Sequence, residues 1–355
     1  MWIADKIYYQ NSSSFTRAYQ GSELVWEKPS PTSNYITFTA KANSSSVGLT
    51  ALSSGQTLEY STDGNTWSNM TTGTTITLNN SGDSVYVRGI LSAVQWFYGY
   101  TNFTTSGNLK LSGNINYLWN KDNPDAELKQ FCGYGLFSGC TALSDVSELE
   151  LPATTLVYNC YASMFNGCTS LTAAPVLPAT TLASHCYFGM FTGCVSLTTA
   201  PVLPATTLAS NCYMYMFNGC TSLTAAPALP ATTLASECYR NMFWNCSSLT
   251  TAPALPATAL TNYCYAYMFQ GCTSLTSSPE LPATTLVTEC YRSMFYGCSN
   301  LNYIKCLATD ISASNCTYSW VNNVSGIGTF VKASSMSSWA TGINGIPSGW
   351  TVENT

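Results

Sequence analysis

The chain repeats one pattern of apolar and polar positions with a step of 26 residues. The repeated unit can be written CYxxMFxGCxSLTxAPxLPATTLxxx, and two series of cysteines mark it: Cys160, Cys186, Cys212, Cys238, Cys264, Cys290 and Cys316, then Cys168, Cys194, Cys220, Cys246, Cys272 and Cys298. A divergent first copy begins at Cys132 and carries two extra residues. A unit this short cannot bury its apolar residues alone, so we expect successive units to stack into a solenoid.

Within one unit, the pattern predicts a helix followed by an extended segment. In "TTLASECYRNMFWNC" the apolar residues Leu234, Cys238, Met242 and Cys246 recur every four positions, as on one helix face. The following "SLTTAPALP" contains prolines, which cannot donate to a strand ladder. The copies at 145–152 and 302–309 read as regular strands. We therefore expect a stack of extended segments whose hydrogen-bond ladder is incomplete.

The expected fold class is α+β, a leucine-rich-repeat-like solenoid of 26-residue units preceded by a small β-sandwich. Strands stack at about 4.8 Å and helices at about 10 Å. The predicted array therefore curves, with its strands on the concave side, into a segment of a horseshoe.

The N-terminal third has a different pattern. Between residues 35 and 90, runs such as "YITFTA" and "SVYVRGI" alternate apolar and polar residues between turn residues, as in an Ig-like β-sandwich. The stretch "KPSPTSN" is typical of a linker. We predict a β attachment module at 1–28, a linker at 29–34, the sandwich at 35–104, the solenoid at 105–325 and a C-terminal cap at 326–355.

The frame "MFNGCTSLTAAPVLP" resembles the "AFxGCxSLxxIxIP" frame of BspA-type leucine-rich repeats, which are common in surface proteins of gut Bacteroidetes and in phages that infect them. The resemblance covers residues 106–350, and "LEYSTDGNTWS" resembles the sandwich that often precedes such arrays. The stretch "AYQGSELVWE" resembles a short module at the start of phage tail and fibre proteins. The prolines and the second cysteine of each unit depart from the family frame.

Composition and charge exclude several partners. Only 8% of the residues are charged, the net charge is -5, and Lys and Arg do not cluster, so neither nucleic acid nor an anionic membrane is an expected partner. No apolar run reaches the length of a membrane span or of a signal-peptide core. We expect no membrane insertion and no export by the usual secretory route.

The residues also argue against catalysis. The single histidine, His185, lies beside Cys186, but Asn211 and Glu237 take its place beside the same cysteine in the next copies. Phosphate-binding glycine loops, HExxH, GxSxG and a motif with paired carboxylates do not occur. We expect neither an enzyme nor a cofactor, and predict no catalytic, cofactor-binding or metal-binding residues.

The cysteines raise a separate question. The two cysteines of a unit are eight residues apart, unlike the closer spacing of zinc ligands, and eight residues of helix span about 12 Å, beyond the reach of a disulfide. We favour buried free thiols that pack as small apolar residues. The alternative is a set of disulfides between neighbouring units.

The positions that vary between copies follow the CY and MF pairs. On the predicted helix they point away from the core, and they are rich in Trp, Tyr and Arg, the residues of binding hot spots. The candidate ligand contacts are Phe188, Met214, Tyr215, Arg240, Trp244, Tyr267, Arg292 and Tyr296. The alternatives are neutral drift and aromatic packing between adjacent helices.

Our main functional hypothesis is a non-enzymatic phage virion protein, a tail or fibre component that recognises a host surface through its solenoid. Its expected partners are a bacterial surface glycan or protein receptor, other virion proteins at the N-terminal module, and a second copy of the chain. The alternative is a BspA-type adhesin on a bacterial cell surface that binds host matrix or glycans. A glycan-degrading or protease activity is a third option, for which we find no constellation of catalytic residues.

Overall fold

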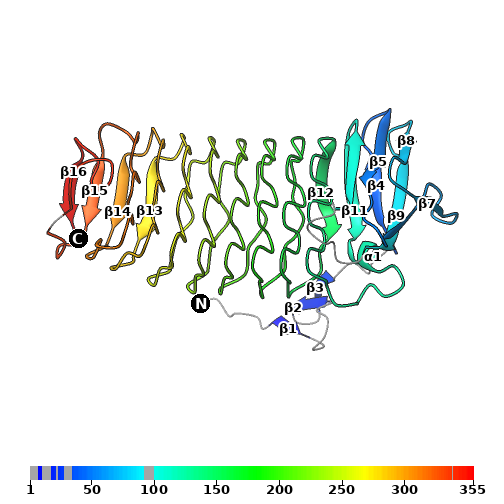
Figure 1. Ribbon diagram of the computed structural model, residues 1–355, viewed down its shortest axis with the longest axis horizontal. Coiled ribbons are helices and arrows are strands. Elements are labelled where there is room, and N and C mark those ends of the chain that lie inside the picture. Colours follow the sequence, from blue (N-terminus) through cyan, green and yellow to red (C-terminus); the bar gives the residue numbers. More distant parts are fainter. Residues whose placement is uncertain (1–6, 10–16, 21–22, 28–33, 92–99, 338) are drawn as a thin grey trace.

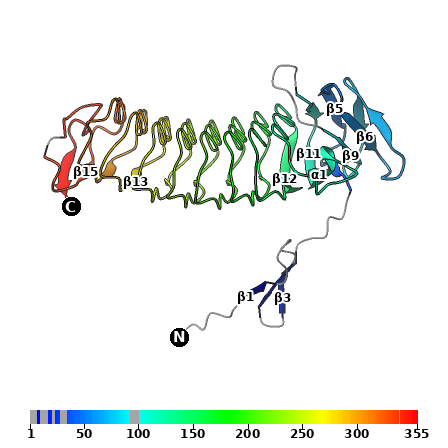
Figure 2. The same ribbon diagram turned by 60° about the horizontal axis from the view of Figure 1, so that its bottom comes forward.

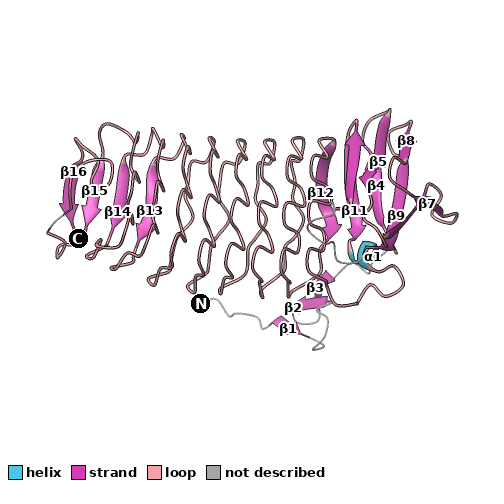
Figure 3. Cartoon of the chain, viewed as in Figure 1, coloured by secondary structure: helices cyan, strands magenta, loops and turns pink. Residues whose placement is uncertain are grey.

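The computed structural model describes residues 7–9, 17–20, 23–27, 34–91, 100–337 and 339–355. Within them the protein is mostly β, and its α-helix is the four-residue α1 (Asn116–Trp119). Figure 3 shows that strands gather at the two ends of the molecule and that the coils between them carry neither arrows nor helices. The expected α+β class is therefore wrong in its helical part.

The first described strands form a small antiparallel sheet in the order β1-β2-β3. These strands are β1 (Ile7–Tyr9), β2 (Arg17–Gln20) and β3 (Glu23–Glu27). Most of the predicted linker, residues 28–33, lies outside the described residues. The predicted role of residues 1–28 as an attachment module stays a prediction.

Two further sheets pack face to face and confirm the strands predicted between residues 35 and 90. The smaller sheet has the order β10-β5-β8, with β10 (Asn102–Ser106), β5 (Ser45–Ala51) and β8 (Thr75–Leu78). The larger has the order β12-β11-β4-β9-β6-β7, with β12 (Leu143–Glu150), β11 (Leu109–Asn114), β4 (Ile36–Ala40), β9 (Ser84–Ile90), β6 (Thr57–Ser61) and β7 (Ser68–Met70). Phe38 of β4 meets Phe103 of β10 between them, with ring centroids 5.5 Å apart.

Strand β11 joins the N-terminal region to the solenoid. It pairs antiparallel with β4 on one side and parallel with β12, the first solenoid strand, on the other (Figure 1). The predicted boundary between residues 104 and 105 falls within β10. The ring of Phe103 stacks on Phe137 of the first unit, 5.5 Å away. The two regions therefore share both a sheet and a hydrophobic core.

The extended segments of the solenoid form the incomplete ladder that the prolines predict. Isolated parallel bridges join the middle units, for example Thr155 to Thr181 and Thr199 to Ala225. Regular strands occur at the two ends, where β12 overlaps the segment predicted at 145–152 and β14 falls within the one predicted at 302–309. The last sheet is parallel, in the order β13-β14-β15-β16, with β13 (Ser277–Leu281), β14 (Tyr303–Cys306), β15 (Thr329–Lys332) and β16 (Thr351–Asn354).

A ribbon of successive turns takes the place of each predicted helix. Two kinds of hydrogen bond alternate along it: Cys186 N–H donates to Ala183 O three residues back (3.2 Å), and Tyr187 N–H donates to Cys212 O in the next unit (3.1 Å). His185, Gly189 and Gly193 are left-handed, with φ of 59°, 57° and 71°. An α-helix of L-residues excludes such angles. We call this element the turn ribbon.

The turn ribbon buries the residues that the helix prediction chose. Leu234, Cys238, Met242 and Cys246 are all buried. Positions four apart drift by roughly 40° per step around an α-helix, but the turn ribbon repeats every four residues and keeps them on one face. With no helices to widen one side, the coils stack as an extended row (Figures 1 and 2), and the predicted horseshoe does not form.

Two columns of stacked rings fill the solenoid. Phenylalanines from successive units lie 5.6 to 5.8 Å apart in one column: Phe137, Phe165, Phe191, Phe217, Phe243, Phe269 and Phe295. Tyrosines lie 5.8 to 6.2 Å apart in the other: Tyr161, Tyr187, Tyr213, Tyr239, Tyr265 and Tyr291. Trp320 closes both columns and stacks on Trp339 at 5.6 Å. Burial of each phenylalanine ring stabilises the fold by about 1.5–3 kcal/mol.

Candidate functional site

The variable positions form the outer surface of the turn ribbon. In one unit the turn ribbon buries Cys186 and Tyr187, leaves Phe188 half-buried, and buries Gly189, Met190 and Phe191. From the unit of Cys160 to that of Cys290, one of the two residues after the Cys-Tyr pair is half-buried and the other is buried. Side chains from neighbouring units therefore meet along one flank of the solenoid.

The N-terminal half of this flank is a row of half-buried rings. The rings contact one another from unit to unit, at centroid distances of 5.4 to 6.4 Å, in the order Phe131, Tyr158, His185, Phe188, Tyr215 and Trp244. We call these six residues the aromatic row. Their mutual packing holds the rings in place while part of each stays exposed.

The C-terminal half of the flank alternates arginines with tyrosines. The Arg240 guanidinium lies 5.7 Å from the ring centroid of Tyr263 and 5.6 Å from that of Tyr267. The Arg292 guanidinium lies 5.8 Å from Tyr267 on its other side and 5.0 Å from Tyr318. We call these five residues the arginine–tyrosine row, and the two rows together the aromatic–arginine flank.

Each arginine is held by a carboxylate of its own unit. Arg240 Nη1 donates to Glu237 Oε2 at 2.6 Å, and Arg292 Nη1 donates to Glu289 Oε2 at 2.7 Å. The hydrogen bond that Arg292 donates to Glu289 raises the pKa of the guanidinium group above its usual value. Pairs of this kind contribute about 0.2–1 kcal/mol. Their main effect is to fix the guanidinium groups between the tyrosine rings, with a third of the Arg292 side chain exposed (32%).

The structure places most of the predicted contact residues on this flank. Phe188, Tyr215 and Trp244 belong to the aromatic row, and Arg240, Tyr267 and Arg292 to the arginine–tyrosine row. Tyr296 is half-buried at an outward position of the turn ribbon.

Met214 does not fit the prediction of an exposed contact. Its side chain is 8% exposed, and Asn211 Nδ2 lies 3.3 Å from its sulfur. Five residues of the flank were missing from the predicted contacts: Phe131, Tyr158, His185, Tyr263 and Tyr318. Each is an aromatic residue within two positions of the first cysteine of its unit, a signal that the sequence does carry.

The cysteines lie inside the solenoid. Fourteen of the sixteen are free and buried, and Cys132 and Cys160 of the first two units form a disulfide. Burial raises the pKa of thiols such as Cys186 and Cys194 to about 12, so they are protonated and unreactive at neutral pH. The preference for free thiols is therefore right for fourteen cysteines, and the alternative of a bond between units is right for one pair.

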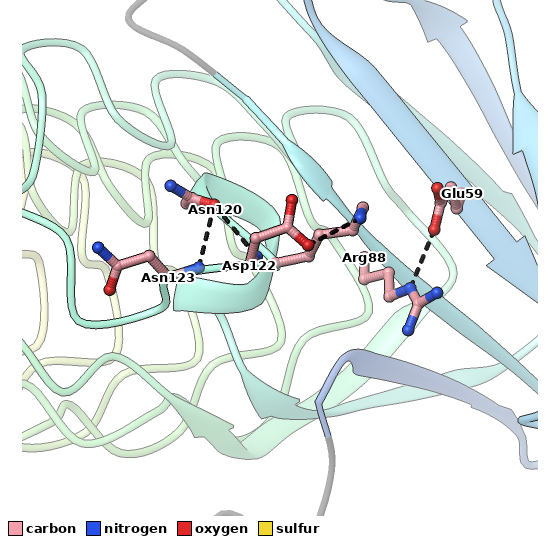
Figure 4. A network of polar contacts seen from close by, with 6 residues as sticks. Glu59, Arg88, Asn120, Asp122 and Asn123 are labelled. Carbon is pink, nitrogen blue, oxygen red and sulfur yellow. Dashed lines mark hydrogen bonds and ion pairs between the residues drawn. The ribbon is translucent and has the colours of Figure 1, made fainter.

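Charged groups away from the flank pair with one another near α1. Arg88 Nε donates to Glu59 Oε2 at 3.0 Å, and Lys121 Nζ donates to Asp122 Oδ1 at 3.0 Å (Figure 4). Asn120 Oδ1 accepts the backbone N–H groups of Asp122 and Asn123, each at 3.1 Å. Arg88 also lies over the ring of Trp67, 3.8 Å from its centroid. These contacts stabilise the loop after α1 and connect β9 to β6 and to the residue before β7.

The described ranges contain no cluster of three or more His, Cys, Asp or Glu side chains placed to hold a metal ion. No described helix has the length and hydrophobicity that crossing a membrane requires. Of the sites that sequence analysis considered, the described structure assembles the aromatic–arginine flank.

One protein-family model matches the chain. It is described as a BspA type leucine rich repeat region of six copies, and it matches residues 127–250 and 185–325, which together exceed half of the chain. No curated protein and no solved structure matches. The matched residues include every unit that contributes to the aromatic–arginine flank.

Proposed function

The chain belongs to the BspA-type leucine-rich-repeat family, and from this premise we propose that it is a non-enzymatic binding protein of a bacterial cell surface. Proteins with these repeats are generally surface binding proteins. The observation that carries the proposal is the aromatic–arginine flank, where eight units place half-buried rings and fixed guanidinium groups on one side of the solenoid. Aromatic residues and arginines of this kind dominate binding energy in protein interfaces.

We propose that the ligand is an uncharged glycan that lies along the aromatic row. Residues 151–236, which supply most of that row, contain no Asp, Glu, Lys or Arg. A charged ligand would therefore find no partner for its charge there. Rings that present an apolar face at intervals of one unit suit the apolar faces of successive sugar rings, and the arginines of the neighbouring row supply hydrogen-bond donors for hydroxyl groups.

A glycan array with matched variants tests this proposal. The test variant is Tyr215→Ala with Trp244→Ala. The control is Val176→Ser with Val202→Ser, which changes two valines that are 72% and 75% exposed. They lie on the strand side, the surface formed by the extended segments of the units. We expect the wild type and the control to bind the same uncharged glycans, and the test variant to lose at least tenfold in signal. Equal binding by both variants would place the site elsewhere. Binding to matrix proteins with no glycan signal would make the partner a protein.

The narrower hypothesis of a phage virion protein rests on the resemblance of residues 18–27 to a tail module. In that case the solenoid would bind a receptor on the host bacterium, and residues 1–28 would contact other virion proteins. Peptide mass spectrometry on purified virions, compared with antibody labelling of intact bacterial cells, separates the two locations. The family match favours labelling of the cells.

A further inference from the structure

Two columns of cysteines run the length of the solenoid beside the stacked rings. The ribbon-start column contains one cysteine from each of eight units: Cys132, Cys160, Cys186, Cys212, Cys238, Cys264, Cys290 and Cys316. The ribbon-end column contains seven: Cys140, Cys168, Cys194, Cys220, Cys246, Cys272 and Cys298. Cys306 on β14 belongs to neither column.

Backbone contacts bring the ribbon-start cysteines of neighbouring units close to one another. The first two members are bridged, with Cα atoms 4.8 Å apart, inside the range of about 4.4–6.8 Å that disulfides span. Further along, the residue after one cysteine donates its N–H directly to the carbonyl of the next cysteine, from Tyr187 to Cys212 at 3.1 Å and from Tyr239 to Cys264 at 3.1 Å. The rings of Phe137 and Phe165, in the two bridged units, are 5.6 Å apart, and those of Phe191 and Phe217 are 5.7 Å apart. The unit spacing thus stays close to that of the bridged pair.

The ribbon-end thiols are already engaged with the backbone. Cys194 Sγ donates to Phe165 O at 3.1 Å, and Cys220 Sγ donates to Phe191 O at 3.2 Å. The same bond to the preceding unit recurs at Cys168, Cys246, Cys272 and Cys298. These sulfurs are held toward a carbonyl of the preceding unit. In the ribbon-start column, Cys316 Sγ donates to Ile311 O at 3.2 Å, and Cys290 Sγ lies 3.9 Å from the carbonyl of Cys316, its neighbour in the column.

We propose that the ribbon-start column contains three further disulfide sites, Cys186–Cys212, Cys238–Cys264 and Cys290–Cys316, which form when the chain folds under oxidising conditions. The pairing follows from adjacency. The existing bridge uses the first two members, and pairing the remaining six between neighbours has one complete solution. In each step two thiols lose two protons and two electrons and join as a disulfide. A low-molecular-weight disulfide such as oxidised glutathione accepts the electrons and becomes two thiols.

Burial fixes the moment at which these bonds form. A thiolate attacks in disulfide exchange, and burial raises the pKa of Cys186 and Cys238 to about 12. The folded, reduced chain therefore exchanges slowly, so the bonds form while the units are coming together and their thiols are still exposed to solvent. A chain that folds reduced keeps its thiols. A chain that folds in an oxidising compartment forms a disulfide across every second junction between neighbouring units.

Refolding of the full chain tests the proposal. The reduced, denatured protein is refolded with reduced glutathione alone or with a mixture of oxidised and reduced glutathione, and links are mapped by peptide mass spectrometry under non-reducing conditions. The mixture should yield the three predicted links together with Cys132–Cys160, and the ribbon-end thiols should still be alkylated after denaturation. The folded, reduced protein in the same mixture should gain none of the three links in the same time.

Several results would overturn the proposal. Full alkylation of the six cysteines after oxidative refolding would exclude the three sites, and a Cys306–Cys316 link or links within the ribbon-end column would contradict the pairing. Equal oxidation of folded and unfolded protein would contradict the proposed timing.

Two variants of one unit provide a matched control. Cys212→Ala should leave Cys186 labelled and the other links intact, whereas Cys220→Ala in the ribbon-end column should keep all four links. If neither variant folds, the disulfide mapping of the wild-type chain still tests the proposal. If Cys220→Ala refolded to the circular dichroism spectrum of the native protein but lacked all four disulfides, the two columns would not be chemically independent.

Discussion

At the scale of the residue, the fold depends on backbone angles that few side chains adopt easily. In one unit Glu237, Asn241 and Asn245 each have φ of 58°, four residues apart. The left-handed conformation costs about 1–2 kcal/mol for most L-residues and less for Gly and Asn. The Gly or Asn before the second cysteine of each unit marks one of these positions. Glycine and asparagine at this place also favour the C-terminal end of a helix, so the residue type alone does not distinguish the two backbones.

Gly219 allows this cost to be measured. It has φ of 72°, and an added Cβ would meet its nearest neighbour, Gly193, at 3.8 Å, an ordinary contact. Gly219→Ala should therefore lower the free energy of unfolding by about 1–2 kcal/mol through the backbone alone. Thr221→Ala, at an exposed position nearby, is the control and should change it by less than about 0.5 kcal/mol. Equal effects in urea unfolding would count against a left-handed backbone at residue 219.

His185 makes the stability of the aromatic row depend on pH. Partial burial lowers its pKa below the usual 6.5, outweighing the opposing charge of Glu237. The folded chain then holds a neutral ring while the unfolded chain still binds a proton. The stability from this group is present above about pH 6.5 and is lost as the pH falls through that value toward the folded pKa.

The variant His185→Asn isolates this effect, because Asn211 occupies the same place in the next unit with φ of 59°. Between about pH 8 and about pH 5 the wild type should lose more in Tm than the variant. A variant that tracks the wild type across this range would show that His185 titrates alike in both states.

At the scale of the element, the sequence predicted the buried face correctly and its backbone wrongly. The apolar residues at every fourth position are compatible with a helix and with a turn ribbon, and only angles and hydrogen bonds between units distinguish the two. A bond such as Gly189 N–H to Met214 O, at 2.8 Å, joins residues far apart in sequence. The helix or turn propensities of neighbouring residues cannot predict a hydrogen bond between two units. The strands around residues 145–152 and 302–309 were predictable because those copies lack the internal proline.

Far-UV circular dichroism of the purified chain tests the turn ribbon. A solenoid with a helix in every unit would give a strong helical double minimum. Because the described chain has one four-residue helix, we expect a spectrum of β-structure and turns without that minimum. A dominant helical signal at neutral pH would show that the units form the helices first predicted.

At the scale of the whole molecule, one core runs from Ile36 in the sandwich to Trp350 in the C-terminal cap. The sequence predicts the repeat and six of the residues on the aromatic–arginine flank, since varied aromatic and arginine positions stand out against a constant frame. It could not establish which rings touch, because the partners of Tyr215 and Tyr267 belong to other units. It also misplaced Met214, because the burial of a flexible side chain depends on the neighbouring units.

Deletion of whole units tests the stacked architecture. Removal of residues 186–211 takes out one unit and leaves every column in register, so the shortened chain should fold, with a modestly lower Tm. Removal of residues 186–198 takes out half a unit and sets buried tyrosines and cysteines against exposed positions. This second deletion should give aggregated or unfolded protein. A folded product from both deletions would mean that the units do not share a continuous core.

The central claim is that this BspA-type solenoid binds its ligand through the aromatic–arginine flank. The most direct measurement is the Kd of the strongest uncharged glycan from the array, by titration calorimetry, for the wild type, for Tyr215→Ala with Trp244→Ala, and for Val176→Ser with Val202→Ser. Loss of two stacking rings should weaken binding by about 2–4 kcal/mol, or roughly thirtyfold to a thousandfold, and the strand-side control should match the wild type. An unchanged Kd in the flank variant, or a loss confined to the strand-side variant, would contradict the account.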